Sequence, residues 1–164
     1  MKATALLKQD HAAVKKLLTQ FGRTTARAVK TRERLAEKIA TELEIHAQIE
    51  EELFYPAAER FDELRPLVDE SREEHEQVKS LVAEMQGFRA GEEALTAKVR
   101  ELRDTVLHHA SEEEAEMFPK VHEHMSEAEL EDLGERMRER KQALLNGMLA
   151  RARRAVMARL RKVA

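Results

Sequence analysis

The chain has 164 residues, of which 42% are apolar, 37% charged and 4% aromatic, and its formal net charge is −3. This length supports one domain with a hydrophobic core, and five glycines and three prolines leave room for long helices. The absence of cysteine excludes disulfides, iron–sulfur clusters, thiol catalysis and thiolate zinc sites. No segment approaches the ~20 apolar residues of a transmembrane helix, and the first residues lack the apolar core of a signal peptide. We therefore expect a cytoplasmic protein.

Apolar residues recur at helical spacing along most of the chain and predict four long helices. Their expected ranges are residues 4–22, about 31–60, 66–87 and about 91–117. Pro56 and Pro119 lie near the ends of the second and fourth helices, where a proline terminates or bends a helix. Because the connections are short, neighbouring helices should run antiparallel. The predicted fold class is all-α: an up-down-up-down four-helix bundle with a C-terminal helical extension.

Residues 126–164 are predicted to form this extension, which leaves residues 1–125 as the bundle domain. Ser126 and Glu129 have the spacing of a capping box, which indicates a helix start. The dipeptide Asn146-Gly147 is expected to break the helix.

The end of the extension is basic. Residues 151–162 contain five arginines, one lysine and no acidic residue, and the pattern is amphipathic, with Val156 and Leu160 opposite the arginines. One interpretation is a helix docked on the acidic bundle near residues 112–116 or 127–135. The alternatives are contact with nucleic acid, an anionic surface or a partner subunit.

Six residues in the two halves of the bundle form a repeat with an offset of 63 or 64 residues. The second and fourth helices each carry a histidine and a glutamate four residues apart, hence on one helix face and about 6 Å apart along its axis. A proline follows each glutamate six residues later. The first and third helices each carry a lone histidine on their apolar stripe. The six residues are His11, His46, Glu50, His75, His109 and Glu113.

Four imidazoles and two carboxylates at one level of a bundle are unfavourable unless a metal compensates them. We therefore predict a site for two metal ions, each with two histidines, and with Glu50 and Glu113 as bridges. Imidazole and carboxylate without sulfur suit iron, manganese or zinc. This ligand set leaves room for an oxo, hydroxo or water bridge and an open position. A redox metal there would bind or activate dioxygen, nitric oxide or peroxide.

Two residues near the predicted ligands, His108 and Tyr55, allow two interpretations each. His108 adjoins His109 and precedes Glu113 with four residues between them, but the repeat favours His109 as the ligand, because Ile45 corresponds to His108 in the second helix. Tyr55 corresponds to a phenylalanine in the second half, which favours simple packing, while an electron or hydrogen bond donated to the site is the alternative. Glu51 and Glu114 follow the bridging glutamates and are expected to face water.

The combined pattern includes Glu-Glu-Glu-Leu-Phe-Tyr-Pro at residues 50–56 and Glu-Glu-Ala-Glu-Met-Phe-Pro at residues 113–119. It resembles the hemerythrin-like family, also described as the HHE cation-binding domain, over about residues 4–122. The resemblance implies a four-helix bundle with two non-haem iron ions held by the six residues above. Two departures stand out: Lys79 occupies the position of a further histidine in the oxygen carriers, and Glu113 replaces their bridging aspartate. The site therefore resembles the iron-repair and nitric-oxide-responsive members more than the respiratory carriers, although the cysteine-bearing module of the former is missing.

These observations favour a protein that binds or senses dioxygen, nitric oxide or iron itself. The alternatives are a di-iron enzyme that consumes peroxide or nitric oxide, and a bundle in which the metal is only structural. Iron is the expected metal ahead of manganese and zinc. A redox partner is also expected, and the sequence leaves its identity open.

Overall fold

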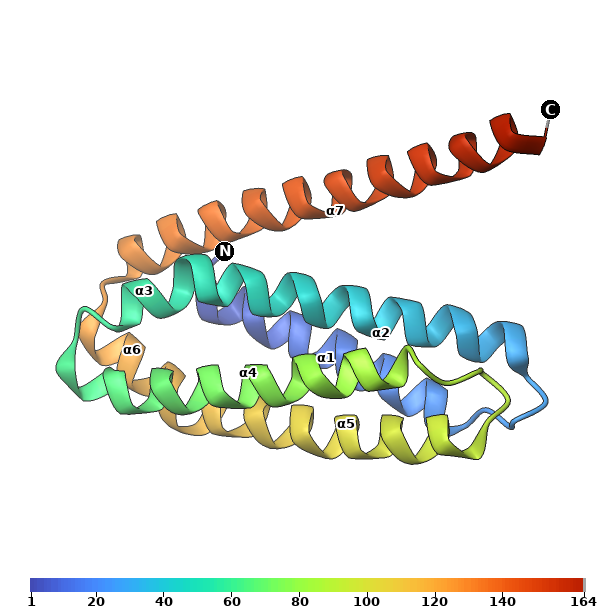
Figure 1. Cartoon of the computed structure of the whole chain (residues 1–164). Coiled ribbons are helices and arrows are strands. Elements are labelled where there is room, and N and C mark those ends of the chain that lie inside the picture. Colours follow the sequence, from blue (N-terminus) through green and yellow to red (C-terminus); the bar gives the residue numbers. More distant parts are fainter. Residues whose placement is uncertain (164) are drawn as a thin grey trace.

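The computed structural model describes residues 1–163. It forms a bundle of four long helices, and a fifth long helix starts against this bundle and projects away from it (Figure 1). The bundle helices are α1 (Ala3–Gly22), α2 (Val29–Ile49), α4 (Arg65–Met85) and α5 (Glu93–Glu112). Helix α1 packs on α2 and α4 packs on α5, while α1–α5 and α2–α4 contacts close the ring. The predicted all-α, up-down-up-down bundle is confirmed.

The two helices that carry the predicted histidine and glutamate pairs continue through their prolines. Each passes into a π-helical turn and then a short α-helix: η1 (Glu50–Phe54) leads to α3 (Tyr55–Ala58), and η3 (Glu113–Met117) leads to α6 (Phe118–His124). In both turns the amide of the residue before the proline donates to the carbonyl of the glutamate five residues earlier. Because proline lacks an N–H and its ring crowds the carbonyl four residues earlier, a widened turn is the local solution. A single 3₁₀ turn, η2 (Asp62–Leu64), then precedes α4.

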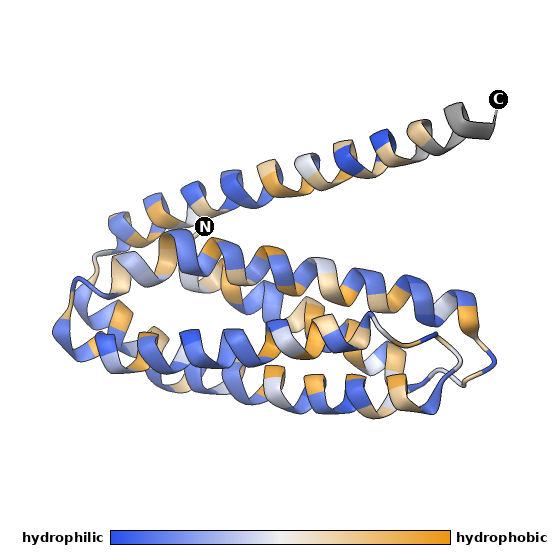
Figure 2. Cartoon of the chain, in the orientation of Figure 1, coloured by the Kyte–Doolittle hydropathy of each residue, from blue (hydrophilic) through white to orange (hydrophobic). Residues whose placement is uncertain are grey.

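Two hydrophobic clusters fill the bundle, one toward each end. Hydrophobic and hydrophilic residues alternate along each helix (Figure 2). One cluster contains Phe54 and Phe118, and the other contains Phe21 and Leu102. Burial of each such side chain stabilises the fold by roughly 1.5–3 kcal/mol. The buried histidines and glutamates of the repeat lie on the helices between these two clusters. The hydrophobic core therefore surrounds a polar layer.

Helix α7 (Glu127–Val163) packs its first half on α1, α2 and η1. The predicted capping box is present: the Ser126 amide donates to Glu129 Oε2 at 2.9 Å, and the Glu129 amide donates to Ser126 Oγ at 3.3 Å. Gly134 lies against the start of α1, where an added Cβ would collide with the carbonyl oxygen of Met1 and approach the amide nitrogen of Ala3 to 2.8 Å. This glycine therefore permits the close approach of the two helices.

The predicted break at Asn146-Gly147 is wrong, because α7 passes through both residues. Asn146 Oδ1 accepts a hydrogen bond from Gln142 Nε2, one turn earlier, at 3.0 Å. A single glycine costs a helix only about 1 kcal/mol, which its alanine, leucine and arginine neighbours offset.

The second half of α7 projects away from the bundle (Figure 1). Arg151, Arg153 and Arg154 are exposed, so docking near residues 112–116 or 127–135 is not seen for these three side chains. The side chains of Val156 and Leu160 lie outside the described residues. Within residues 1–163, none of the helices combines the length and apolar character that crossing a bilayer requires.

Candidate metal centre

The structure brings all six residues of the repeat together inside the bundle. α1, α4 and α5 supply His11, His75 and His109, α2 supplies His46, and the glutamates are the first residues of the two π-helical turns. All six are less than 9% exposed, and Glu50 and Glu113 are only 0% and 1% exposed. The potential ligand atoms fall into two overlapping groups, each within 4.8 Å: His11, His46, Glu50 and Glu113, and Glu50, His75 and His109.

Each glutamate contacts one histidine from each half of the chain. Glu50 Oε2 lies 3.2 Å from the Nε2 atoms of both His46 and His75. Glu113 Oε2 lies 3.3 Å from His11 Nε2 and 3.7 Å from His109 Nε2. Each carboxylate therefore lies between one histidine of the first half and one histidine of the second half.

Many of these buried polar atoms lack a hydrogen-bond partner. They include both carboxylate oxygens of Glu50, Oε2 of Glu113, Nε2 of His11 and both ring nitrogens of His46. These ligand atoms lie close together but are poorly aligned for hydrogen bonds with one another. Metal ligands that converge on one ion have the same arrangement. Because an uncompensated buried carboxylate is costly, the donor set fits metal ions placed among these atoms.

The pKa values of these residues in the chain without metal also reflect the unfavourable burial of charged groups. Burial, followed by the charge of Glu113, holds the pKa of Glu50 well above 4.5. Burial opposes ionisation of Glu113 too, but the interactions with His11 and His109 lower its pKa to about 2. Burial lowers the pKa of His46 from 6.5 to about 4, which leaves this imidazole neutral, as a metal ligand must be.

A carboxylate lies behind each of the four imidazoles, facing its Nδ1 atom. The distances are 2.9 Å for Glu114 and His11, 2.9 Å for Glu51 and His75, 2.7 Å for Glu74 and His109, and 3.7 Å for Asp10 and His46. At 2.7–2.9 Å such a partner fixes the ring orientation and tautomer, with Nδ1–H toward the carboxylate and Nε2 toward the metal site, whereas Asp10 faces His46 at a distance too long for a hydrogen bond. This role of the four carboxylates was not predicted from the sequence, and the prediction that Glu51 and Glu114 simply face water is wrong.

The repeat contains the signal that could have found them. Asp10 and Glu74 each precede the lone histidine of their half, and Glu51 and Glu114 each follow the bridging glutamate. The acidic residues therefore repeat at the same offset as the ligands, which an exposed acidic face would not require.

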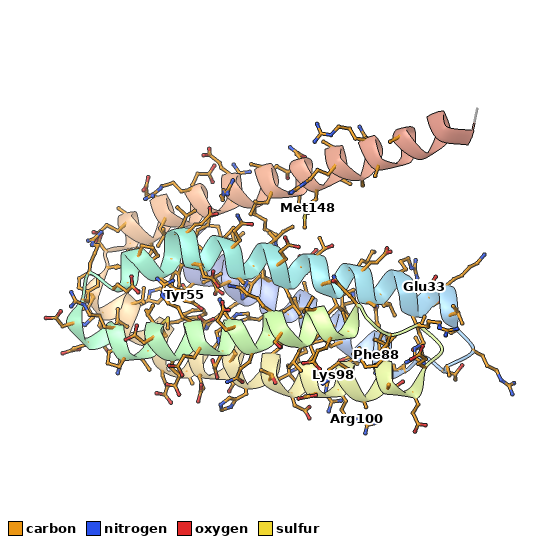
Figure 3. The ribbon with its side chains drawn as sticks, in the orientation of Figure 1. Glu33, Tyr55, Phe88, Lys98, Arg100 and Met148 are labelled. Atoms are coloured by element: carbon orange, nitrogen blue, oxygen red, sulfur yellow. The ribbon has the colours of Figure 1, made fainter. Side chains whose placement is uncertain are left out.

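Tyr55 does more than pack. Its hydroxyl donates a hydrogen bond to Glu113 Oε1 at 3.0 Å and lies 3.1 Å from His75 Nε2, between α3 and α4 (Figure 3). Burial and the two glutamates raise its pKa well above 10, so the hydroxyl keeps its proton. His108, in contrast, has a side chain that is 65% exposed and lies near Glu74 and Glu112, outside the buried cluster.

A small cavity of about 20 Å³ adjoins the four imidazoles. Its remaining walls are the apolar side chains of Val14, Leu43, Ala47, Val78 and Val106. This volume holds one molecule of about the size of water. Lys79 lies outside this cavity, with its Nζ atom 3.0 Å from Glu51 and 2.8 Å from Glu76. The lysine therefore pairs with two glutamates and is not placed as a further metal ligand.

Comparison with known proteins agrees with this geometry. The family model of the hemerythrin HHE cation-binding domain matches residues 2–121. The uncharacterised protein Rv2633c of Mycobacterium tuberculosis is 30% identical over 138 residues, which cover 84% of this chain and 83% of that protein. An uncharacterised hemerythrin-like protein of Schizosaccharomyces pombe is 30% identical over 90 residues, which cover 54% and 44%.

The fold is also similar to that of a solved structure. The crystal structure of a hemerythrin HHE cation-binding domain-containing protein from Mycobacterium kansasii, described as a homologue of Rv2633c, aligns with a TM-score of 0.80 at 28% identity and covers 93% of both chains. This chain therefore belongs to the hemerythrin HHE cation-binding domain family.

Proposed function

We propose that this protein binds two iron ions and uses them to bind or sense a small diatomic molecule, dioxygen or nitric oxide. The ligands of the proposed centre are the six residues of the repeat, His11, His46, Glu50, His75, His109 and Glu113. One ion would be held by the α1 and α2 histidines, and the other by the α4 and α5 histidines. Manganese and zinc are the less favoured metals, and zinc fits this purpose least, because it does not exchange electrons with a diatomic gas.

The observation that supports ligand binding is the cavity beside the imidazoles. Iron, when bound, supplies an open coordination position and an electron for the small molecule. The protein contributes the shape around that position: apolar side chains on α1, α2, α4 and α5 exclude bulk water and larger molecules. A volume of about 20 Å³ is of the order needed for one small molecule, which supports a diatomic ligand over a larger substrate.

The chain also fixes its own protons and charges there. The outer carboxylates hold the imidazole rings in place, and Tyr55 keeps a proton at the edge of the Glu113 carboxylate. The Tyr55 hydroxyl favours a second candidate function, an enzyme that consumes peroxide or nitric oxide, because it is a buried hydrogen-bond donor next to the proposed metals. Repeated turnover with peroxide that is lost in Tyr55→Phe would support this alternative over simple binding.

A variant that fills the cavity tests the proposal. Ala47→Leu adds three carbon atoms to the cavity wall without changing a proposed ligand, and Ala83→Leu makes the same change on the exposed face of α4. We expect both variants to load iron anaerobically, and the absorption change on adding nitric oxide to be lost only in Ala47→Leu. An unmodified, iron-loaded protein without a spectral response to nitric oxide or dioxygen would refute binding of a diatomic ligand.

The projecting end of α7 is a candidate contact for an anionic partner. Residues 147–164 contain six Lys or Arg residues and no Asp or Glu. We propose that this segment binds nucleic acid or an anionic surface, since a basic helix of this kind attracts polyanions. Removal of residues 147–164 should abolish salt-dependent binding to DNA or to anionic vesicles, and unchanged binding would refute this role.

A further inference from the structure

Helix α7 reaches the proposed metal centre through one buried ion pair. Lys141 Nζ lies 2.5 Å from Oδ1 of Asp10, whose side chain is only 9% exposed. The lysine side chain itself is 23% exposed and also lies 3.8 Å from Glu42. Lys141 is outside the residues 2–121 that match the family model, so the contact joins the extension to the bundle.

Asp10 is the carboxylate behind His46. Its second oxygen, Oδ2, faces His46 Nδ1 at 3.7 Å, which is too long for a hydrogen bond, and neither atom has a hydrogen-bond partner. The other three imidazoles lie 2.7–2.9 Å from their carboxylates. His46 is thus the ring whose carboxylate is also held by a cation from α7. The outer carboxylate of His75 pairs with a lysine as well, but that lysine, Lys79, lies on α4 within the bundle.

The packing of α7 places Lys141 at this point. Gly134 lies against Ala3 at the start of α1, and Lys141 lies against Asp10. Both intervals are seven residues, two helical turns, so the two helices run side by side in the same direction with one register. The close approach that Gly134 permits therefore brings the ammonium group to a carboxylate on the neighbouring helix.

We propose that Lys141 is a positioning residue of the metal centre, acting through Asp10 on His46; this rests on the proposed metal site. The ammonium group holds one Asp10 oxygen, which keeps the other oxygen buried and directed at the His46 ring. Without the lysine, a buried carboxylate would lose its cation and turn toward solvent, because an unpaired buried charge is unfavourable. The His46 ring would then lose the group that orients its Nε2 toward the metal.

The test is the rate at which a chelator removes zinc from the loaded protein, since zinc reports on the ligands without redox chemistry. Lys141→Met keeps most of the aliphatic side chain and removes the charge. Arg140→Met is the matched control, because Arg140 fastens α7 to Glu52 on η1 at 2.6 and 2.9 Å and does not contact Asp10 or His46. We expect zinc loss to be about 10-fold faster in Lys141→Met, within about 2-fold of the unmodified protein in Arg140→Met, and restored in Lys141→Arg.

Two further measurements separate positioning from a general loss of stability. The ¹⁵N signal of His46 Nδ1 in the zinc-loaded protein should shift in Lys141→Met and stay in place in Arg140→Met. Asp10→Asn combined with Lys141→Met should lose zinc no faster than Asp10→Asn alone. Equal rates in Lys141→Met and Arg140→Met, or additive effects with Asp10→Asn, would overturn the proposal. Failure of the unmodified protein to bind zinc or iron would instead refute the metal site itself.

Discussion

Replacement of Glu50 by glutamine should stabilise the metal-free protein and weaken the metal-loaded one. Glu50 is fully buried, neither of its carboxylate oxygens has a hydrogen-bond partner, and the Glu113 carboxylate is close by. A glutamine removes one charge and supplies N–H donors to its neighbour. Relief of one unsatisfied buried charge is worth about 2 kcal/mol, which corresponds to an increase in Tm of roughly 4–8 °C for a chain of this length. The same change removes a proposed bridging ligand, so metal should stabilise Glu50→Gln far less.

The assay is urea unfolding followed by helical circular dichroism, with chelator and with added ferrous iron under anaerobic conditions. The matched control is Glu116→Gln on the same π-helical turn as Glu113, where the side chain is exposed.

The raised pKa of Glu50 also predicts a pH dependence. The unfolded chain releases the Glu50 proton near pH 4.5, whereas the folded chain holds it to a higher pH, so stability falls as the pH rises between these two pKa values. The advantage of Glu50→Gln should therefore be largest above neutral pH and vanish below about pH 4.5. If Glu50→Gln destabilises the metal-free protein at pH 8, the buried carboxylate is already compensated and our reasoning fails.

Three other substitutions, two of them with a matched control, give clear outcomes. Tyr55→Phe removes the 3.0 Å hydrogen bond to the bridging carboxylate and should cost the metal-free protein about 1–2 kcal/mol in urea unfolding, without loss of metal stoichiometry. Gly134→Ala should cost about 1–3 kcal/mol and expose α7 to amide hydrogen exchange, because the new methyl group collides with the first residues of the chain, whereas Gly147→Ala, with open space around it, should stabilise the protein slightly. His109→Ala should lower the bound metal to about one ion per chain in elemental analysis, while His108→Ala, on the surface, should leave it unchanged. Equal metal content in the two histidine variants would contradict the assignment of His109, and not His108, as the ligand.

The helices of the bundle could be predicted because each carries one apolar stripe and ends near a glycine, a proline or a polar turn. The π-helical turns could not, since they depend on how the chain absorbs Pro56 and Pro119 while the ligand glutamates stay on the inner face. The uninterrupted course of α7 through Gly147 escaped prediction for a related reason. A local helix breaker costs little when a long helix continues on both sides.

The inner histidines and glutamates of the site were found from the sequence because their repeat is unlikely by chance. The outer carboxylates were missed because acidic residues are common on helix surfaces, and only the folded bundle shows that Glu74 and Glu114 face imidazole rings from other helices. The contact between Lys141 and Asp10 spans 131 positions of the sequence. It depends on the packing of α7 against α1, which local patterns do not encode.

Anomalous diffraction from crystals of the iron-loaded protein tests the central claim most directly. We predict two separate iron peaks inside the bundle, one beside His11 and His46 and the other beside His75 and His109, with Glu50 and Glu113 contacting both. A single peak, or iron bound only at surface carboxylates, would contradict the account.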